Sequence, residues 1–316
     1  MMKKINDIIG DAKTIGIAGH LRPDGDCMGS CMSFYNYLKK NRPDLDVRVF
    51  LEFVDKKFNI IENTDQIITT GYDGTKFDLF ISLDTASLDR LGLNLPFYEN
   101  AKRTACIDHH ASNDGYADYN YILPKASSAS EVLYDLLDED LIDKSIAEPM
   151  YMGIAHDSGV FRFQSTTPKT MRIAANMIEK GVNVNMILEE TFFRKTYNQM
   201  MVTAKIQSEA VLALDGKCIY GYCTSEMMEE YGVTTKDLDA VVASIRNVDG
   251  VEVAMFLYQL SEDSYKVSLR SKNYVDVSKI AVENGGGGHV RAAGAEIHGK
   301  LNDIINKLLN RIKQDI

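Results

Sequence analysis

The sequence predicts an α/β protein of two domains, in which a mainly parallel sheet flanked by helices is followed by a smaller α/β unit. In the first half of the 316-residue chain, short apolar runs of strand length alternate with longer segments of helical period, a pattern typical of a helix-covered parallel sheet. A chain of this length usually divides into two hydrophobic cores. We place the first domain at residues 1–188, a helical linker at 189–214 and the second domain at 215–316.

The elements of the first domain follow from these apolar runs and their punctuation. Strands are expected at residues 14–18, 47–52, 77–83 and 104–107, and helices at 27–40, 130–137, 146–155 and 169–180. Pro168 and Gly181 mark the start and the stop of the last of these helices.

The second domain is expected to contain a hairpin. Strands are predicted at 217–222, 251–259, 265–269 and 293–297, and helices at 237–245, 277–283 and from 301 onward. The polar residues 261–263 would form the hairpin turn. The preceding stretch, 185–214, has helical periodicity and few turn signals, which is why the linker is placed there.

The net charge, the cysteine content and the length of the apolar runs limit which functions and locations the sequence supports. The formal net charge of -10 argues against a broad basic footprint for long nucleic acid but leaves room for a local anion site. The five cysteines show no disulfide framework, so we expect buried thiols and a cytoplasmic location. No apolar run reaches the ~20 residues that a membrane span needs, and no membrane partner is expected.

Acidic and imidazole side chains follow several of the predicted strands, where a parallel sheet forms its ligand sites. They are His20, Asp24, Asp26, Asp84, Asp108 and His109, and Asp157 comes further along the chain. Carboxylates gathered in a partly desolvated site repel one another unless some are protonated or cations bind. The pattern predicts a hydrolytic centre with two divalent ions. Imidazole and carboxylate ligands without cysteine favour manganese, with iron, zinc and magnesium as alternatives.

These motifs carry a family resemblance that spans nearly the whole chain. They are His20-x-x-x-Asp24-x-Asp26, Asp84, Asp108-His109-His110, Asp157-Ser158-Gly159, Gly285-Gly286-Gly287-Gly288-His289 and Ala292-Ala293-Gly294. The set resembles the DHH phosphoesterase family, in the branch that carries the DHH-associated C-terminal domain. Within that branch it is most similar to the two-domain NrnA-like oligoribonuclease and cyclic di-adenylate phosphodiesterase group.

The resemblance implies a role for each residue of the centre. His20, Asp24 and Asp84 would hold one manganese ion, and Asp26, Asp84, His109 and Asp157 would hold the other, with Asp84 bridging the pair. His110 would face the scissile phosphate, and Asp108 would orient its neighbours rather than bind metal. From the tripeptide alone, His110 could equally be a structural imidazole hydrogen-bonded within its loop.

The second domain is expected to bind the substrate. Consecutive glycines at Gly286, Gly287 and Gly288 would let backbone N–H groups approach an anion, with His289 beside them. Arg270, at the end of the predicted hairpin, matches a family position that would hold phosphate or base. The alternatives are a flexible turn for the glycines and a solvated charge for the arginine. No Lys and Ser or Thr follow the last glycine, so a nucleoside-triphosphate loop is disfavoured.

The expected activity is hydrolysis of short oligonucleotides, or of linear or cyclic dinucleotides, to mononucleotides. A phosphatase acting on 3′-phosphoadenosine 5′-phosphate is the first alternative, and a catalytically silent nucleotide-binding regulator is the second. An inorganic pyrophosphatase is disfavoured, because the resemblance pairs that activity with a different C-terminal domain. A homodimer is compatible with the sequence.

Overall fold

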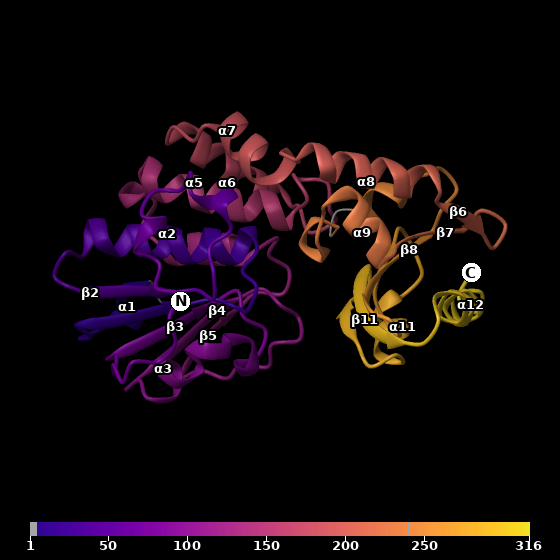
Figure 1. Ribbon diagram of the computed structural model, residues 1–316. Coiled ribbons are helices and arrows are strands. Elements are labelled where there is room, and N and C mark those ends of the chain that lie inside the picture. The colour runs from indigo at the N-terminus through magenta and orange to yellow at the C-terminus, as the bar shows by residue number, and fades with distance from the viewer. Residues whose placement is uncertain (1–4, 239–240) are drawn as a thin grey trace. The chain divides into compact units, whose positions relative to one another are not determined.

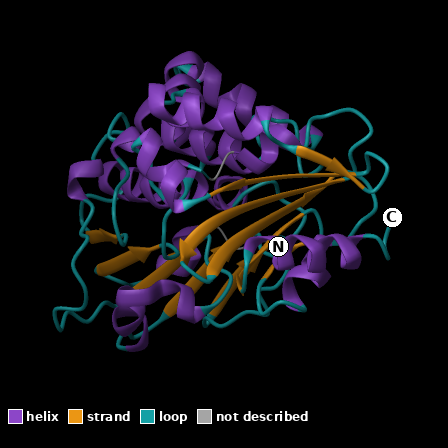
Figure 2. Ribbon diagram, turned by 45° about the vertical axis from the view of Figure 1, so that its right-hand side comes forward, coloured by secondary structure: helices purple, strands orange, loops and turns teal. Residues whose placement is uncertain are grey.

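The computed structural model describes residues 5–238 and 241–316, and these form two compact units, one ending at Arg194 and one beginning at Lys195. Each unit has its own β-sheet with helices packed against it (Figure 1). Figure 2 distinguishes the helices from the strands by colour. The α/β class expected from the sequence is confirmed.

The first unit contains a five-stranded parallel sheet of order β2-β1-β3-β4-β5. Its strands are β1 (Thr14–Ala18), β2 (Asp46–Phe50), β3 (Leu79–Leu83), β4 (Thr104–Asp108) and β5 (Tyr119–Ile122). Its helices are α1 (Ile5–Ile9), α2 (Gly25–Asn41), α3 (Leu95–Glu99), α4 (Ala129–Leu136), α5 (Lys144–Asp157), α6 (Pro168–Glu179) and α7 (Val184–Leu188), and a π-helical turn follows at Glu189–Phe193.

Both faces of the sheet are covered at its inner strands, which explains why β1, β3 and β4 are largely apolar and buried. All five residues of the central strand β3 are buried. Helices α2 and α5 lie on one face and α3 on the other (Figure 1). On the α3 face, a cluster of aromatic rings fills the core, including Phe50, Phe77, Phe80 and Phe97.

Helices α2 and α5 cross with almost no side chain between them. A Cβ on Gly29 would lie 2.4 Å from the carbonyl oxygen of Pro149 and 2.8 Å from the Cα of Gly153, closer than packed atoms approach. A helix-interior glycine costs about 1 kcal/mol relative to alanine, so close packing is the reason for these glycines. This contact draws the N-terminus of α2 and the C-terminus of α5 toward the same edge of the sheet.

The second unit contains a mixed six-stranded sheet of order β10-β11-β9-β8-β7-β6, in which only the β7–β8 pair among the described strands is parallel. Its strands are β6 (Val211–Ala213), β7 (Cys218–Cys223), β8 (Val253–Ser261), β9 (Ser264–Ser271), β10 (Gly287–His289) and β11 (Ala292–His298). Its helices are α8 (Tyr197–Ser208), α9 (Ser225–Tyr231), α10 (Val241–Ile245), α11 (Val277–Val282) and α12 (Leu301–Ile312).

Several elements were not expected from the sequence, namely α1, α3, β5, β6, α9 and β10. Strands β6 and β10 have three residues each, too few for an alternating pattern to be recognised. Strand β6 falls within the expected helical linker at 189–214. The expected helix 237–245 begins at Val241, and residues 239–240 of that prediction lie outside the described residues. Within the described part of the chain, no helix is long and apolar enough to cross a bilayer.

Candidate metal centre

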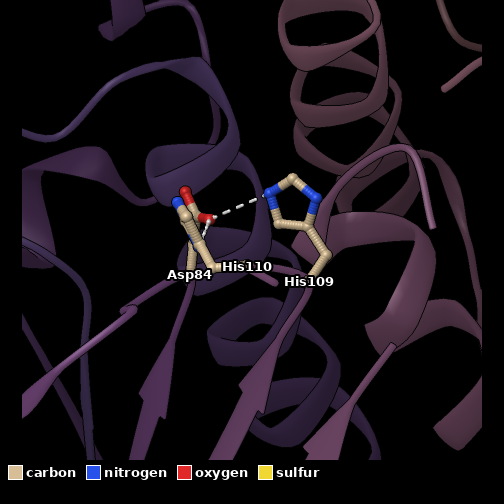
Figure 3. A group of neighbouring side chains, drawn as sticks. All are labelled: Asp84, His109 and His110. Carbon is tan, nitrogen blue, oxygen red and sulfur yellow. Dashed lines mark ion pairs between the residues drawn. The ribbon is translucent and has the colours of Figure 1, made fainter. Parts of the chain in front are cut away.

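Asp84 lies at the middle of the candidate centre. It follows β3, is 2% exposed, and adopts a φ of 52°, a left-handed conformation that is uncommon for a residue with a Cβ. Strained backbone of this kind persists where surrounding structure enforces it, often at functional sites. Figure 3 shows its carboxylate beside the imidazoles of His109 and His110, with dashed lines marking the ion pairs.

One group of potential ligands surrounds Oδ2 of Asp84. His20 Nε2 lies 3.4 Å from this oxygen and 3.7 Å from Oδ2 of Asp24. Asp24 is the N-cap of α2, and its Oδ1 accepts hydrogen bonds from the backbone N–H groups of Asp26 and Cys27. The cap leaves the second carboxylate oxygen directed toward His20. The three side chains can share one ion.

A second group lies on the other side of Asp84. His109 Nε2 is 3.5 Å from Oδ1 of Asp84, 3.4 Å from Oδ2 of Asp157 and 4.0 Å from Oδ2 of Asp26. Asp157 is the last residue of α5, so the crossing of α2 and α5 brings it to Asp26. Asp26, His109 and Asp157 can share an ion, and Asp84 is within reach of both groups.

The histidines have a defined orientation. His20 Nδ1 lies 2.7 Å from the carbonyl oxygen of Leu21, and His109 Nδ1 lies 3.4 Å from that of Ala126. A carbonyl oxygen only accepts, so Nδ1–H donates in each ring and Nε2 is the atom directed toward the carboxylates, where an ion would take the place of its proton. This is the tautomer that a metal-binding imidazole requires.

Asp26 is fixed by the N-terminus of α4. Its carboxylate accepts hydrogen bonds from the backbone N–H groups of Ala129 (2.6 Å) and Ser130 (3.0 Å) and from the Ser130 hydroxyl (2.6 Å). A helix N-terminus favours negative charge. Ser130 is therefore a positioning residue that the motif search missed.

The gathered carboxylates make the centre attract positive charge. Burial alone would lower the pKa of His109, but Asp84, Asp157 and Asp26 outweigh it and raise that pKa to about 10. Burial raises the pKa of Asp157 to about 7, with Asp84 and Asp24 contributing. Burial also opposes ionisation of Asp84, yet His109 and His20 hold its pKa well below the ordinary range.

The residues present fit a pair of divalent ions. Oδ1 of Asp84 is buried, and no donor of the described chain forms a hydrogen bond to it. Its nearest donors are His109 Nε2 at 3.5 Å and His110 Nδ1 at 3.6 Å, which form ion pairs with it rather than hydrogen bonds. A buried carboxylate oxygen that accepts no hydrogen bond is costly, and a shared cation would satisfy it. The oxygen and nitrogen donors around it suit ions such as manganese or magnesium.

Asp108 has a different environment from the potential ligands. It is fully buried at the end of β4. Its Oδ1 lies 2.7 Å from His110 Nδ1, and its Oδ2 accepts a 2.7 Å hydrogen bond from Asn113 Nδ2. Both oxygens are thus engaged, which supports an orienting role for Asp108. Asn113 is a further residue that the sequence search missed, because no motif marks it.

Comparisons with known proteins identify the relatives of this chain. The N-terminal domain model of the DHH family matches residues 14–154, and the DHHA1 domain model matches residues 215–314. The chain is 31% identical to the bifunctional oligoribonuclease and PAP phosphatase NrnA of Thermus thermophilus, over 96% of this chain and 90% of that protein. The chain belongs to the DHH family.

Solved structures support the same fold. An exopolyphosphatase-related protein from Bacteroides fragilis superposes with a TM-score of 0.89 at 22% identity, covering 98% of this chain and 95% of that one. RecJ of Thermus thermophilus, crystallised with Mn²⁺, matches with a TM-score of 0.50 at 11% identity, over 98% of this chain and 53% of that one.

The DHHA1 part of this family member carries the residues expected to bind substrate. Arg270 in β9 pairs with Ala292 in β11, and Ala292 pairs with His289 in β10. Directly opposite residues of antiparallel strands project from the same face. Arg270 and His289 therefore lie on one face of the sheet, on either side of the small Ala292.

The glycine run is only partly the open cradle that the sequence suggested. A Cβ on Gly286 would lie 2.1 Å from the carbonyl oxygen of Gly294, and one on Gly288 would lie 2.5 Å from that of Ala292. These two glycines allow close approach to β11. Gly287 has open space around it, and it remains the glycine best placed to admit a ligand.

Proposed function

We propose that this DHH-family protein is a metal-dependent phosphodiesterase that hydrolyses short oligonucleotides, or linear or cyclic dinucleotides, to mononucleotides. The observation that carries the proposal is the buried Asp84 carboxylate, which lies within 3.5 Å of both His20 Nε2 and His109 Nε2. A single carboxylate between two ligand groups is the arrangement that a two-ion phosphoesterase centre needs.

The ligands would divide around Asp84. His20, Asp24 and Asp84 would hold one ion, and Asp26, His109, Asp157 and Asp84 would hold the other. When bound, the ions would lower the pKa of a water and neutralise charge on the phosphate oxygens. We propose manganese, because the donors are carboxylate and imidazole without thiolate and because the RecJ neighbour was crystallised with it.

His110 would act on the substrate rather than on an ion. Its Nδ1–H donates to Asp108, so Nε2 is the atom that can accept or release a proton. Burial lowers the pKa of His110, but Asp108 and Asp84 outweigh this effect and the net shift is upward. The upward shift favours the protonated ring, which would stabilise or protonate the leaving oxygen.

Arg270, His289 and Gly287 would bind the phosphate and sugar of the substrate. The side chains of Arg270 and His289 share one face of the second sheet, and an arginine fork matches a phosphate group. The net charge of -10 disfavours long polyanions, so the substrate is short. We propose a cytoplasmic location, consistent with five free and buried cysteines; a homodimer remains a prediction.

Removal of the 3′-phosphate from 3′-phosphoadenosine 5′-phosphate is the second candidate. It is favoured by the Thermus thermophilus relative, which is described as both an oligoribonuclease and a PAP phosphatase. The same centre could act on either phosphoester.

The test is turnover of a substrate panel by the purified protein. The panel contains pApA, cyclic di-adenylate, a short RNA, 3′-phosphoadenosine 5′-phosphate and pyrophosphate, each with manganese, magnesium or EDTA. We expect metal-dependent release of mononucleotides by the wild type and none by Asp84→Asn. Faster hydrolysis of pyrophosphate than of any nucleotide would contradict the proposal, and so would turnover in EDTA.

A further inference from the structure

The second unit presents one exposed aromatic ring on a tightly fixed loop. Tyr274 lies between β9 and α11 and is 54% exposed. A single exposed aromatic residue is ordinary by itself. Here, however, two charged side chains, one buried and one partly buried, hold the backbone on both sides of the ring. A loop that only exposed a tyrosine to solvent would not need such restraints.

Glu252 holds the N–H groups of the loop. Its side chain is buried, and its Oε1 accepts hydrogen bonds from the backbone N–H groups of Asn273 (3.0 Å), Tyr274 (2.7 Å) and Val275 (3.0 Å). Burial opposes ionisation, but these bonds hold the pKa of Glu252 below its ordinary value. Hydrogen bonds to an ionised group are roughly twice as strong as neutral ones, so one carboxylate fixes three consecutive peptide groups.

Arg291 holds the carbonyl groups of the same loop. Its guanidinium donates to the carbonyl oxygens of Asn273 and of Val275, the latter at 2.8 Å. These carbonyls flank Tyr274. Because Arg291 lies between β10 and β11, two residues after His289, it ties the tyrosine loop to the glycine segment.

Backbone hydrogen bonds tie the segments on either side of the Tyr274 loop to the turn between β10 and β11. Val290, 49% exposed, accepts a backbone hydrogen bond of 3.0 Å from Val277 at the start of α11. Ser271, the residue after Arg270, donates its backbone N–H to the carbonyl oxygen of Arg291 (3.1 Å). The Tyr274 loop is therefore tied to the strands that carry Arg270 and His289. An aromatic ring and an arginine presented by neighbouring segments match a nucleotide, whose base stacks while its phosphate is paired.

We propose that Tyr274 stacks on a nucleobase of the substrate whose phosphate is held by Arg270 and His289, and that Glu252 and Arg291 are positioning residues for that ring. The proposal rests on the proposed function, since the nucleotide is the substrate of the centre. The sequence alone does not indicate which of the 16 tyrosines would stack on a base, and the hydrogen bonds around Tyr274 single out this one.

The absence of tryptophan from the chain permits a direct binding test. The full-length Tyr274→Trp variant carries a single indole, and Tyr197→Trp, at an exposed position of α8, is its matched control. Each is titrated in magnesium with a pApA analogue in which a methylene group replaces the bridging oxygen, and with the abasic equivalent. We expect saturable fluorescence quenching only for Tyr274→Trp with the base-bearing ligand. Equal quenching by the abasic ligand, or none by either, would overturn the proposal.

Kinetics supply the second test. Tyr274→Ala removes the ring, and we expect it to raise the KM for pApA about 10-fold while kcat stays within about two-fold of the wild-type value. Tyr274→Phe keeps a ring that can stack, and we expect it to retain the wild-type KM. Neither change should alter turnover of the abasic dinucleotide. An unchanged KM for Tyr274→Ala in an active protein would refute stacking. Failure of the wild type to hydrolyse any nucleotide would refute the proposed function instead, and the fluorescence titration would still decide the role of Tyr274.

The positioning role is tested separately with Glu252→Gln and Arg291→Lys. Glu252→Gln should raise the KM for pApA and leave the KM for the abasic dinucleotide unchanged, because Glu252 holds only the tyrosine loop. Arg291→Lys, which also loosens the tie to the glycine segment, should raise the KM for pApA more than that for the abasic dinucleotide. An equal rise for both substrates would show a general structural defect and would refute the positioning role.

Discussion

Nδ1 of His110 lies 2.7 Å from Oδ1 of Asp108, and this bond fixes which nitrogen of the ring can exchange a proton. Asp108→Asn would present an amide to Nδ1 and remove the negative charge that raises the pKa of His110. We expect kcat to fall about 10- to 100-fold, as for other partners that orient an active-site group, with two ions still bound. Metal analysis alongside steady-state kinetics checks this, and loss of an ion would make Asp108 a ligand.

Asp84→Asn should be more severe, because both ligand groups converge on this carboxylate. We expect loss of bound metal and of turnover together, measured by metal analysis after gel filtration and by product release. Asp78→Asn is the matched control, since that carboxylate is engaged by Lys102 and by the start of β1. Full metal content in Asp84→Asn would refute bridging.

Substitution of two neighbouring glycines by residues with a side chain should have different effects. Gly286→Ala places a Cβ against the backbone of Gly294, and we expect it to destabilise the second unit by about 2 kcal/mol, as overpacking commonly does. Gly287→Val has open space; it should raise KM without changing metal content or unfolding. Chemical denaturation and kinetics of both variants test the distinction, and a destabilised Gly287→Val would contradict it.

His156 should make the first unit sensitive to acid. Its ring packs against Phe58 and Phe192, and Nε2 lies 2.8 Å from the Thr191 hydroxyl. This enclosure, together with Lys57, lowers the pKa of His156 from 6.5 to about 4.

Because the unfolded chain binds a proton first as the pH falls, the contribution of His156 is complete above pH 6.5 and is lost toward pH 4. We expect a loss of about 3 kcal/mol across that window, absent in His156→Gln. Denaturation in EDTA at several pH values measures it, with His298→Gln, at an exposed site, as the control. Parallel pH profiles for wild type and His156→Gln would refute the assignment.

Most of the fold was predictable from local pattern. The apolar runs at β1, β3 and β4 are continuous because both faces of the sheet are buried, and Pro168 and Gly181 bound α6 within a residue or two. The short strands β6 and β10 were not predictable, since their pairing depends on neighbours distant in the sequence. The glycine run gave no strand signal at all.

Most of the candidate ligands were predictable because they come directly after strands or in the first turn of the helix that follows β1, at one edge of the sheet; Asp157, at the end of α5, was found by its motif. Their partners were not. Ser130 reaches Asp26 from another helix, and Asn113 reaches Asp108 across a loop. Neither position bears a motif, so only the folded structure reveals them. Gly153 was also missed, although a glycine inside a helix is a signal of close packing.

Because Gly29 and Gly153 bring the backbones of α2 and α5 into contact, the distance between the ligands on these two helices is set by backbone packing rather than by side-chain packing. The carboxylates of Asp26 and Asp157 come from segments far apart in the chain, and two residues without side chains set how closely their helices meet. A bulkier residue at Gly29 would press on the backbone of α5 and force the two helices apart, and one at Gly153 would also press on Asp26 Oδ1 itself, 2.7 Å from the added Cβ. The distance between the carboxylates of the candidate centre thus depends on two glycines that supply no ligand to it.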